Sequence, residues 1–224
     1  MIAEERTPTE ATPVSPWLRS RSKRYADLGV AIPLFIVAVP VLIICAVAIK
    51  LTSRGPLLFR HQRAGRFGKP FEVLKLRTMR QLTDGSHAGA SENSDSARLT
   101  PLGRFLRRFS LDELPQLINV IRGDMSIVGP RPLPVSYIDR YSDAERRRLS
   151  ARPGLTGLSQ VTIRNLGDWT DKLTLDVDYV DTATLGLDLR ILLRTVRAVV
   201  TGMGVQAPGH ATMPELTAER SSHN

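Results

Sequence analysis

Residues 28–49 read LGVAIPLFIVAVPVLIICAVAI and contain no charged side chain. A straight helix of this length covers about 33 Å, roughly the hydrocarbon thickness of a bilayer. A buried core helix and a secretory signal are the alternatives. Such a run is unusual in a small soluble domain, and it begins too late and is too long for the apolar part of a signal peptide. We therefore expect a membrane helix.

Basic side chains flank the apolar run on both sides. They are Arg19, Arg21, Lys23 and Arg24 before it, and Lys50, Arg54, Arg60 and Arg63 after it. Lys and Arg favour the cytoplasmic side, so a simple span leaves one flank on the wrong side. Pro40 donates no hydrogen bond and clashes with the carbonyl of Ile36, which favours a bend. We expect a re-entrant helix over residues 23–54 that breaks near Pro40; a proline-kinked spanning helix is the alternative.

The composition of the 224-residue chain restricts its partners. Lys and Arg number 31 against 22 Asp and Glu, a formal charge of +9, which predicts an anionic partner such as a lipid headgroup or a phosphorylated substrate. The single cysteine, Cys45, excludes an internal disulfide framework and a cysteine-rich zinc site. Basic and aromatic residues do not interleave, and no DNA-binding pattern is present, so we expect no nucleic-acid partner.

The remainder of the chain is typical of a helix-rich α/β domain. We expect a disordered lead over residues 1–22, a cytosolic domain over 55–206 and a loose tail over 207–224. Alternation predicts a strand over 71–77, and residues 83–96 are typical of a polar loop. Helical spacing predicts amphipathic surface helices over 102–109, 111–121, 136–149 and 188–201. The last carries Arg190, Arg194 and Arg197, and is either an ordinary solvated helix or one that lies on acidic headgroups.

The densest cluster of chemical groups follows Arg104, in the sequence RFLRRFSLDELPQ. Ser110 and Glu113 have the spacing of a capping box, in which Glu113 only bonds the Ser110 amide and Asp112 only complements the helix dipole. The functional reading is different. Exposed amides at a helix start would hold Asp112 ionised as a nucleophile. Adjacent carboxylates can bind Mg²⁺ together with substrate phosphates, and the arginines upstream suit phosphate contact.

Several longer runs resemble the bacterial sugar transferase family, the small monotopic phosphoglycosyl transferases. The resemblance covers about residues 23–213. It is carried by KRYAD (23–27), FRHQRAGRFGKPFEVLKLRTM (59–79), SLDELPQLINVIRGDMSIVGPRP (110–132), RPGLTGLSQV (152–161) and LDVDYV (175–180). It implies an enzyme of the cytoplasmic (inner) membrane, with its catalytic domain on the cytosolic face and a re-entrant helix that breaks at a proline.

The resemblance also implies an activity. A sugar 1-phosphate passes from a nucleotide diphosphate sugar, usually a UDP-sugar, to a polyprenyl phosphate such as undecaprenyl phosphate, and UMP leaves. Asp112 matches the nucleophile that forms a covalent phosphosugar, and Glu113 matches the residue associated with Mg²⁺. The matching phosphate-binding groups are Arg107, Arg131, Lys75 and Arg77, and further candidates for substrate contact are Arg152, Gln160 and Asp176. The alternative is a membrane-anchored basic binding protein in which Asp112 and Glu113 only cap a helix.

Overall fold

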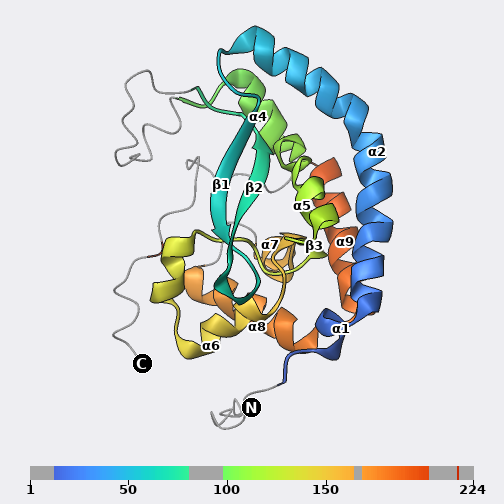
Figure 1. Cartoon of the computed structure of the whole chain (residues 1–224), viewed down its shortest axis with the longest axis vertical. Coiled ribbons are helices and arrows are strands. Elements are labelled where there is room, and N and C mark those ends of the chain that lie inside the picture. Colours follow the sequence, from blue (N-terminus) through green and yellow to red (C-terminus); the bar gives the residue numbers. More distant parts are fainter. Residues whose placement is uncertain (1–12, 81–97, 164–167, 202–215, 217–224) are drawn as a thin grey trace.

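The computed structural model describes residues 13–80, 98–163, 168–201 and 216. A long helix, α2 (Arg21–Thr52), lies along one side of an α/β body (Figure 1). The body contains two small sheets. The strands are β1 (Leu58–Ala64), β2 (Pro70–Leu76), β3 (Ser126–Val128) and β4 (Gly154–Thr156). The other helices are α1 (Pro16–Arg19), α4 (Pro101–Arg108), α5 (Gln116–Arg122), α6 (Asp143–Arg146), α7 (Leu158–Thr162), α8 (Trp169–Thr182) and α9 (Leu185–Val200), with 3₁₀ turns η1 (Arg66–Gly68), η2 (Leu111–Glu113), η3 (Val135–Arg140) and η4 (Arg147–Ser150).

Helix α2 is continuous through Pro33 and Pro40. It is the one helix in the described part of the chain that is long and apolar enough to cross a membrane, with a mean hydropathy of 3.0 over its most apolar window. Only 17% of that window is buried against the protein, so most of its apolar surface faces outward. The ribbon curves over the upper end of the body in Figure 1, as a helix containing prolines is expected to do. Re-entry into one leaflet stays a prediction.

A buried polar cluster fastens the first half of α2 to the body. Lys23 Nζ donates to Asp27 Oδ1 at 3.1 Å, to Asp188 Oδ2 at 2.8 Å and to the Val128 carbonyl at 3.2 Å. Asp27 also accepts from the Ser126 hydroxyl at 2.9 Å. Because these charges lie in the interior, each is stabilised by its oppositely charged neighbours. Removing one of them leaves an uncompensated buried charge and destabilises the fold. We call Lys23, Asp27, Ser126, Tyr179 and Asp188 the anchoring cluster.

Two sheets position the loops that carry the candidate site. β1 and β2 pair antiparallel, with Phe59 opposite Lys75 and Arg63 opposite Phe71. β3 and β4 pair parallel, with Ser126 opposite Gly154. Helix α5 is joined to β2 through Asn119, which donates to the Glu72 carbonyl at 2.8 Å and accepts from the Leu74 amide at 3.2 Å. This side chain fixes the helix that follows the Asp-Glu pair against the strand that carries Lys75.

Several sequence predictions hold and others are wrong. The strand over 71–77 and the helices over 102–109 and 188–201 are confirmed by β2, α4 and α9. The helix over 136–149 is wrong, because η3, α6 and η4 divide that segment into short turns. The loop over 83–96 lies outside the described residues, as do residues 1–12 of the lead and all of the tail except Leu216.

The lead is not disordered over residues 13–22, contrary to the sequence prediction. Ser15 donates its amide to the Val180 carbonyl at 3.0 Å and its hydroxyl to the Ala183 carbonyl at 2.5 Å. Trp17 Nε1 donates to Asp188 at 2.9 Å. These distant partners, which a local sequence pattern does not show, give α1 a fixed place. In the tail, Leu216 is buried and its amide donates to the Tyr137 hydroxyl at 3.3 Å.

Candidate active site

The Asp-Glu pair lies in the 3₁₀ turn η2, between α4 and α5. Ser110, just before the turn, takes a left-handed conformation with φ of 54° and its side chain caps nothing. The predicted capping box is therefore wrong: α5 begins only at Gln116, and Glu113 faces β2 instead of the Ser110 amide. With it the structural basis of the helix-cap alternative is lost. A non-glycine residue at positive φ is uncommon and here turns the chain sharply at the site.

Glu113 forms an ion pair with Lys75. Lys75 Nζ lies 2.6 Å from Glu113 Oε1, and the two side chains keep 30% and 23% of their exposure. Burial on its own would raise the pKa of Glu113, but the charges of Lys75, Arg131 and Arg107 outweigh it and lower the pKa below the usual value. Glu113 is therefore ionised, with an anionic oxygen still accessible beside the pair.

Asp112 is more deeply buried, with 6% of its surface exposed. Burial and then the negative charge of Glu113 raise its pKa to about 6, against the opposing effects of Lys75 and Arg107. The sequence prediction that helix-start amides hold Asp112 ionised is wrong in direction, because the turn places the carboxyl in the interior. Because a pKa of about 6 lies below 7, the ionised form still predominates at neutral pH. A poorly solvated carboxylate of this kind is a better nucleophile than a solvated one.

Two of the predicted phosphate-binding arginines border this pair. Arg107, in the last turn of α4, donates from Nε to the Thr78 hydroxyl at 3.1 Å. Gly103 permits this approach, because a Cβ there would lie 2.0 Å from the Thr78 carbonyl oxygen. Arg131 has an exposed side chain whose charge reaches Glu113. The charges of Lys75, Arg107 and Arg131 thus all act on this pair of carboxylates, and phosphate binding by these residues stays a prediction.

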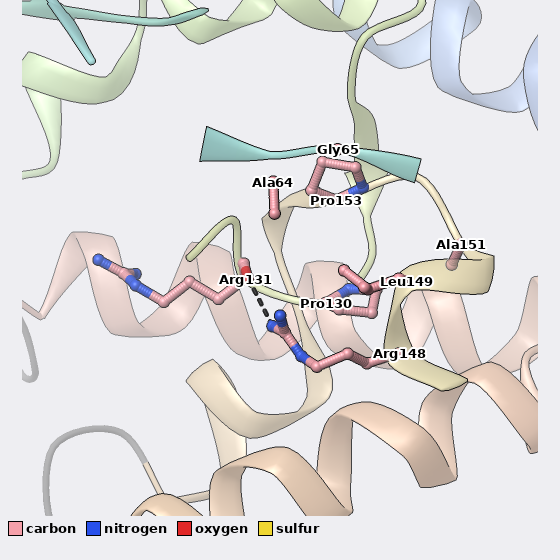
Figure 2. A pocket seen from close by; sticks show the side chains of 8 residues that line it. All are labelled: Ala64, Gly65, Pro130, Arg131, Arg148, Leu149, Ala151 and Pro153. Carbon is pink, nitrogen blue, oxygen red and sulfur yellow. Dashed lines mark hydrogen bonds between the residues drawn. The ribbon is translucent and has the colours of Figure 1, made fainter. Parts of the chain in front are cut away.

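The turn that carries Arg131 is held in place by a hydrogen bond from Arg148. Arg148 Nη2 donates to the Arg131 carbonyl at 2.6 Å, and Figure 2 shows the Arg131 side chain extending away from that contact. Gly129 and Gly154 lie in contact where this turn meets the segment around Pro153, since a Cβ on Gly154 would lie 2.2 Å from the Gly129 nitrogen. The small cavity between these segments measures about 10 Å³, which is room for one water and not for a sugar nucleotide.

The comparison with known families settles what this arrangement belongs to. Residues 18–202 match the bacterial sugar transferase family. The chain belongs to the bacterial sugar transferase family. The match extends from the end of α1 through α9, so it includes the membrane-capable helix, the Asp-Glu turn and both sheets.

Several named proteins are similar to this sugar transferase. The UDP-glucose:undecaprenyl-phosphate glucose-1-phosphate transferase of Caulobacter vibrioides is 47% identical over 189 residues, which cover 80% of this chain and 70% of that protein. The uncharacterized sugar transferase EpsL of Bacillus subtilis is 41% identical over 195 residues, which cover 87% of this chain and 95% of the relative. The exopolysaccharide production protein ExoY of Sinorhizobium fredii is 38% identical over 197 residues, 82% and 87% of the two chains.

The remaining candidate residues of this sugar transferase have other neighbours. Asp176 is buried and accepts from Arg148 Nη2 at 2.6 Å and from Ser159 at 2.7 Å, so it supports the Arg131 turn through Arg148. Gln160 donates to the Leu155 carbonyl at 3.4 Å, and its Oε1 is buried without a partner. The charge of Arg152 acts on Arg66 at the tip of the β1–β2 hairpin. Substrate contact by these three stays a prediction.

Arg77 differs from the other predicted phosphate-binding residues. Its Nη2 donates to the carbonyl and hydroxyl oxygens of Ser53, at 2.8 and 3.0 Å. Ser53 is the C-cap of α2, so Arg77, the first residue after β2, connects that strand with the membrane-capable helix. It has a buried side chain, and nothing in the sequence pattern distinguishes its position from that of Lys75.

Sequence reasoning names Arg63 only as a basic residue flanking the apolar run, and it misses the anchoring cluster and α8. Burial, followed by the charge of Arg131, lowers the pKa of Arg63 to about 10, which places it beside the Arg131 turn. Its signal was its presence in the 59–79 run, to which no role was attached. Lys23, Asp27 and Tyr179 lie in the equally recognisable runs 23–27 and 175–180. Charged residues in such runs point to buried partners that one chain segment cannot reveal.

The site offers two carboxylates to a metal ion. Among the described residues there is no group of three or more Asp, Glu, His or Cys side chains that could enclose one. Mg²⁺ usually takes only one or two carboxylates and completes its shell with water and substrate phosphates. Glu113, with one oxygen on Lys75 and the other without such a partner, fits that pattern.

Proposed function

We propose that this enzyme transfers a sugar 1-phosphate from a UDP-sugar to a polyprenyl phosphate such as undecaprenyl phosphate, releasing UMP. The observation that carries the proposal is the buried Asp112, whose carboxylate adjoins the Lys75–Glu113 pair and Arg107. The name of the Caulobacter relative specifies the same kind of donor and acceptor. The reaction would begin the membrane stage of exopolysaccharide or glycoconjugate synthesis.

In the first step Asp112 attacks the donor. A carboxylate oxygen bonds to the β-phosphorus, which carries the sugar, and the bond from that phosphorus to the bridging oxygen breaks. UMP leaves with the bond's electron pair, and the phosphosugar remains on Asp112. Arg107 and Arg131 are placed to hold the diphosphate oxygens, because guanidinium groups suit phosphate contact and both charges act on the pair.

In the second step an oxygen of the polyprenyl phosphate attacks the phosphorus on Asp112. The acyl phosphate bond breaks, the carboxylate is restored and a polyprenyl diphosphosugar is released. Because the first acceptor of the phosphosugar is the protein itself, donor and lipid need not be bound together. Burial of Asp112 supports this scheme by limiting the access of water to the intermediate.

Glu113 is the residue that would hold Mg²⁺, together with the phosphate oxygens of the donor. The ion would neutralise charge that develops on the leaving phosphate. Lys75 fixes the Glu113 carboxylate through the 2.6 Å contact and keeps it ionised, and the second carboxylate oxygen would be the one that holds the ion.

The proposed location is the cytosolic face of the inner membrane. The apolar outer surface of α2 supports it, and so does α9, where large apolar residues are exposed beside a basic stripe. These exposed residues are Leu185, Leu189, Leu193, Val196 and Val200. An amphipathic helix of this kind lies in the interface plane.

Nucleotide release tests the proposal. The purified full-length protein is mixed with Mg²⁺, undecaprenyl phosphate and each of a panel of UDP-sugars, beside an Asp112→Asn variant. Release of UMP by the parent only is the expected result. Release of UDP would mean ordinary glycosyl transfer and would overturn the mechanism. EDTA is expected to stop the release, and activity that persists in EDTA would remove Mg²⁺ from the proposal.

A further inference from the structure

Arg77 carries a buried charge that the fold does not compensate. Its side chain keeps 7% of its exposure, and Nε and Nη1 are enclosed without any hydrogen-bond acceptor. Only Nη2 has partners, both of them uncharged oxygens of Ser53. Arginine remains protonated at any physiological pH, and a buried donor without an acceptor is strongly unfavourable. Such an exception in a folded protein requires an explanation.

Other buried cations of this chain are compensated. Lys23 contacts the carboxylates of Asp27 and Asp188. Arg148 contacts Asp176, the Tyr141 hydroxyl and a backbone carbonyl. In the described part of the chain no carboxylate lies within ion-pair distance of Arg77. Within the described residues, Lys23 and Arg148 thus each have a carboxylate partner and Arg77 has none, which points to an anion supplied by a ligand.

The position of Arg77 indicates where that anion comes from. Ser53 ends α2, and the Arg77 amide donates to the carbonyl of Leu57 at 3.0 Å, so the guanidinium lies where the membrane-capable helix passes into the body. The phosphate of a polyprenyl lipid is confined to this depth, because its hydrocarbon chain stays in the bilayer while the charged group stays at the interface.

Arg77 is joined to the Asp-Glu site through its neighbours in the chain. Arg77 is the first residue after β2, which ends at Leu76, and it follows Lys75 by two residues. The next residue, Thr78, accepts the hydrogen bond from Arg107 at 3.1 Å, and the charge of Arg107 acts on Asp112. Lys75 before Arg77 and Thr78 after it thus both contact groups of the Asp-Glu site.

We propose that Arg77 binds the phosphate of the acceptor lipid and delivers it to the phosphosugar on Asp112. The phosphate oxygens accept hydrogen bonds from the guanidinium nitrogens that lack partners, while the Ser53 contacts hold the side chain in place. This inference rests on the proposed function and assigns Arg77 to the acceptor, in contrast to the groups that hold the donor.

Half-reaction kinetics test this assignment. The full-length protein, Arg77→Gln and Arg77→Lys are assayed in neutral detergent micelles with the active UDP-sugar. With donor alone we expect each to release the same stoichiometric amount of UMP. With undecaprenyl phosphate added, we expect the acceptor KM of Arg77→Gln to rise about 10-fold or more, the range for a lost charge-assisted hydrogen bond, and the donor KM to stay within about 2-fold. The acceptor KM of Arg77→Lys should lie between that of the parent and that of Arg77→Gln.

The control is Arg54→Gln, which removes an equal charge one residue beyond Ser53 from an exposed side chain. Its acceptor KM is expected to equal that of the parent. An unchanged acceptor KM in Arg77→Gln overturns the assignment. Loss of the donor-only release in both Arg77 variants does so too, because Arg77 would then be needed before the acceptor arrives. Absence of that release in the parent would instead count against the proposed function.

A second arm separates the acceptor from ordinary anionic lipid, which offers the same phosphate chemistry. The assay is repeated in micelles that contain phosphatidylglycerol. We expect the defect of Arg77→Gln to be present in neutral detergent alone. A defect that emerges only with phosphatidylglycerol would assign Arg77 to a structural lipid and overturn its role in acceptor binding.

Discussion

The anchoring cluster and the Asp-Glu site are built from the same types of residue but differ in completeness. In the anchoring cluster, Lys23 contacts two carboxylates and a carbonyl, and the Tyr179 hydroxyl donates to Asp188 at 2.7 Å. In the site, among the described residues, Lys75 forms an ion pair with Glu113 only. Asp112 is buried there with no cation within ion-pair distance. A complete buried network fixes the fold, whereas an incomplete one keeps hydrogen-bonding and reactive capacity for a substrate.

The largest expected difference between the two clusters is in turnover. Asp112→Asn removes the proposed nucleophile, so UMP release should fall by at least about 10³-fold, while the fold persists. Steady-state UMP release measures this effect, and the circular dichroism spectrum should match that of the parent. Turnover within about 10-fold of the parent would contradict covalent catalysis by Asp112.

The same variant should be more stable than the parent at neutral pH. Burial raises the pKa of Asp112 to about 6, so the neutral form is favoured in the folded state; that stabilisation is complete below the unfolded pKa and is lost as pH rises through about 6. Asn is always neutral and avoids this loss. We expect a gain in the free energy of unfolding of about 1–3 kcal/mol at pH 7.5 that vanishes near pH 4. Denaturant unfolding at both pH values is the measurement, and an equal gain at both would refute the pKa argument.

The anchoring cluster should respond in the opposite way. Lys23→Met leaves Asp27 and Asp188 buried without their shared cation, so the free energy of unfolding should fall by about 3–5 kcal/mol. The folded fraction should keep its specific activity, because the cluster does not border the carboxylates of the site. Arg21→Met, an exposed change in the same helix, is the matched control and should unfold like the parent. A stable but inactive Lys23→Met protein would place this cluster in catalysis.

Prediction from sequence succeeded where the signal is local and failed where it depends on distant partners. The apolar run, the strand that carries Lys75 and the helix that carries Arg107 follow from spacing alone, and β2 and α4 confirm the last two. The conformation of Ser110 does not follow, because the Lys75–Glu113 pair competes with a local cap and lies 38 residues apart in sequence. The order of residues 13–22 depends on Val180, Ala183 and Asp188, which no local pattern includes.

A smaller effect should link the two carboxylates of the site through Lys75. Lys75→Gln removes the cation that lowers the pKa of both, so the pKa of Asp112 should rise above about 6. Asp112 is competent only when ionised, so the acidic limb of the rate profile should move to higher pH. We expect the plateau rate to fall by about 10–100-fold as Glu113 loses its fixed position. The pH dependence of donor-only UMP release measures the position of the acidic limb and the plateau rate together. A lower plateau with an acidic limb that does not move would mean that Lys75 contacts substrate instead.

The smallest expected effect concerns membrane contact, to which neither cluster contributes directly. Leu193, on α9, is 71% exposed, and Leu193→Glu places a charge in the middle of the apolar face without disturbing the core. If α9 lies in the interface, the variant should keep its donor-only UMP release and lose about 2- to 10-fold in turnover of lipid acceptor in vesicles, because α2 still retains the protein on the membrane. Arg190→Glu, on the basic stripe of the same helix, separates the contribution of charge attraction from that of apolar burial. Its defect should appear with anionic vesicles and disappear at high salt, whereas the Leu193→Glu defect should persist there, since screening weakens charge attraction and leaves apolar burial intact.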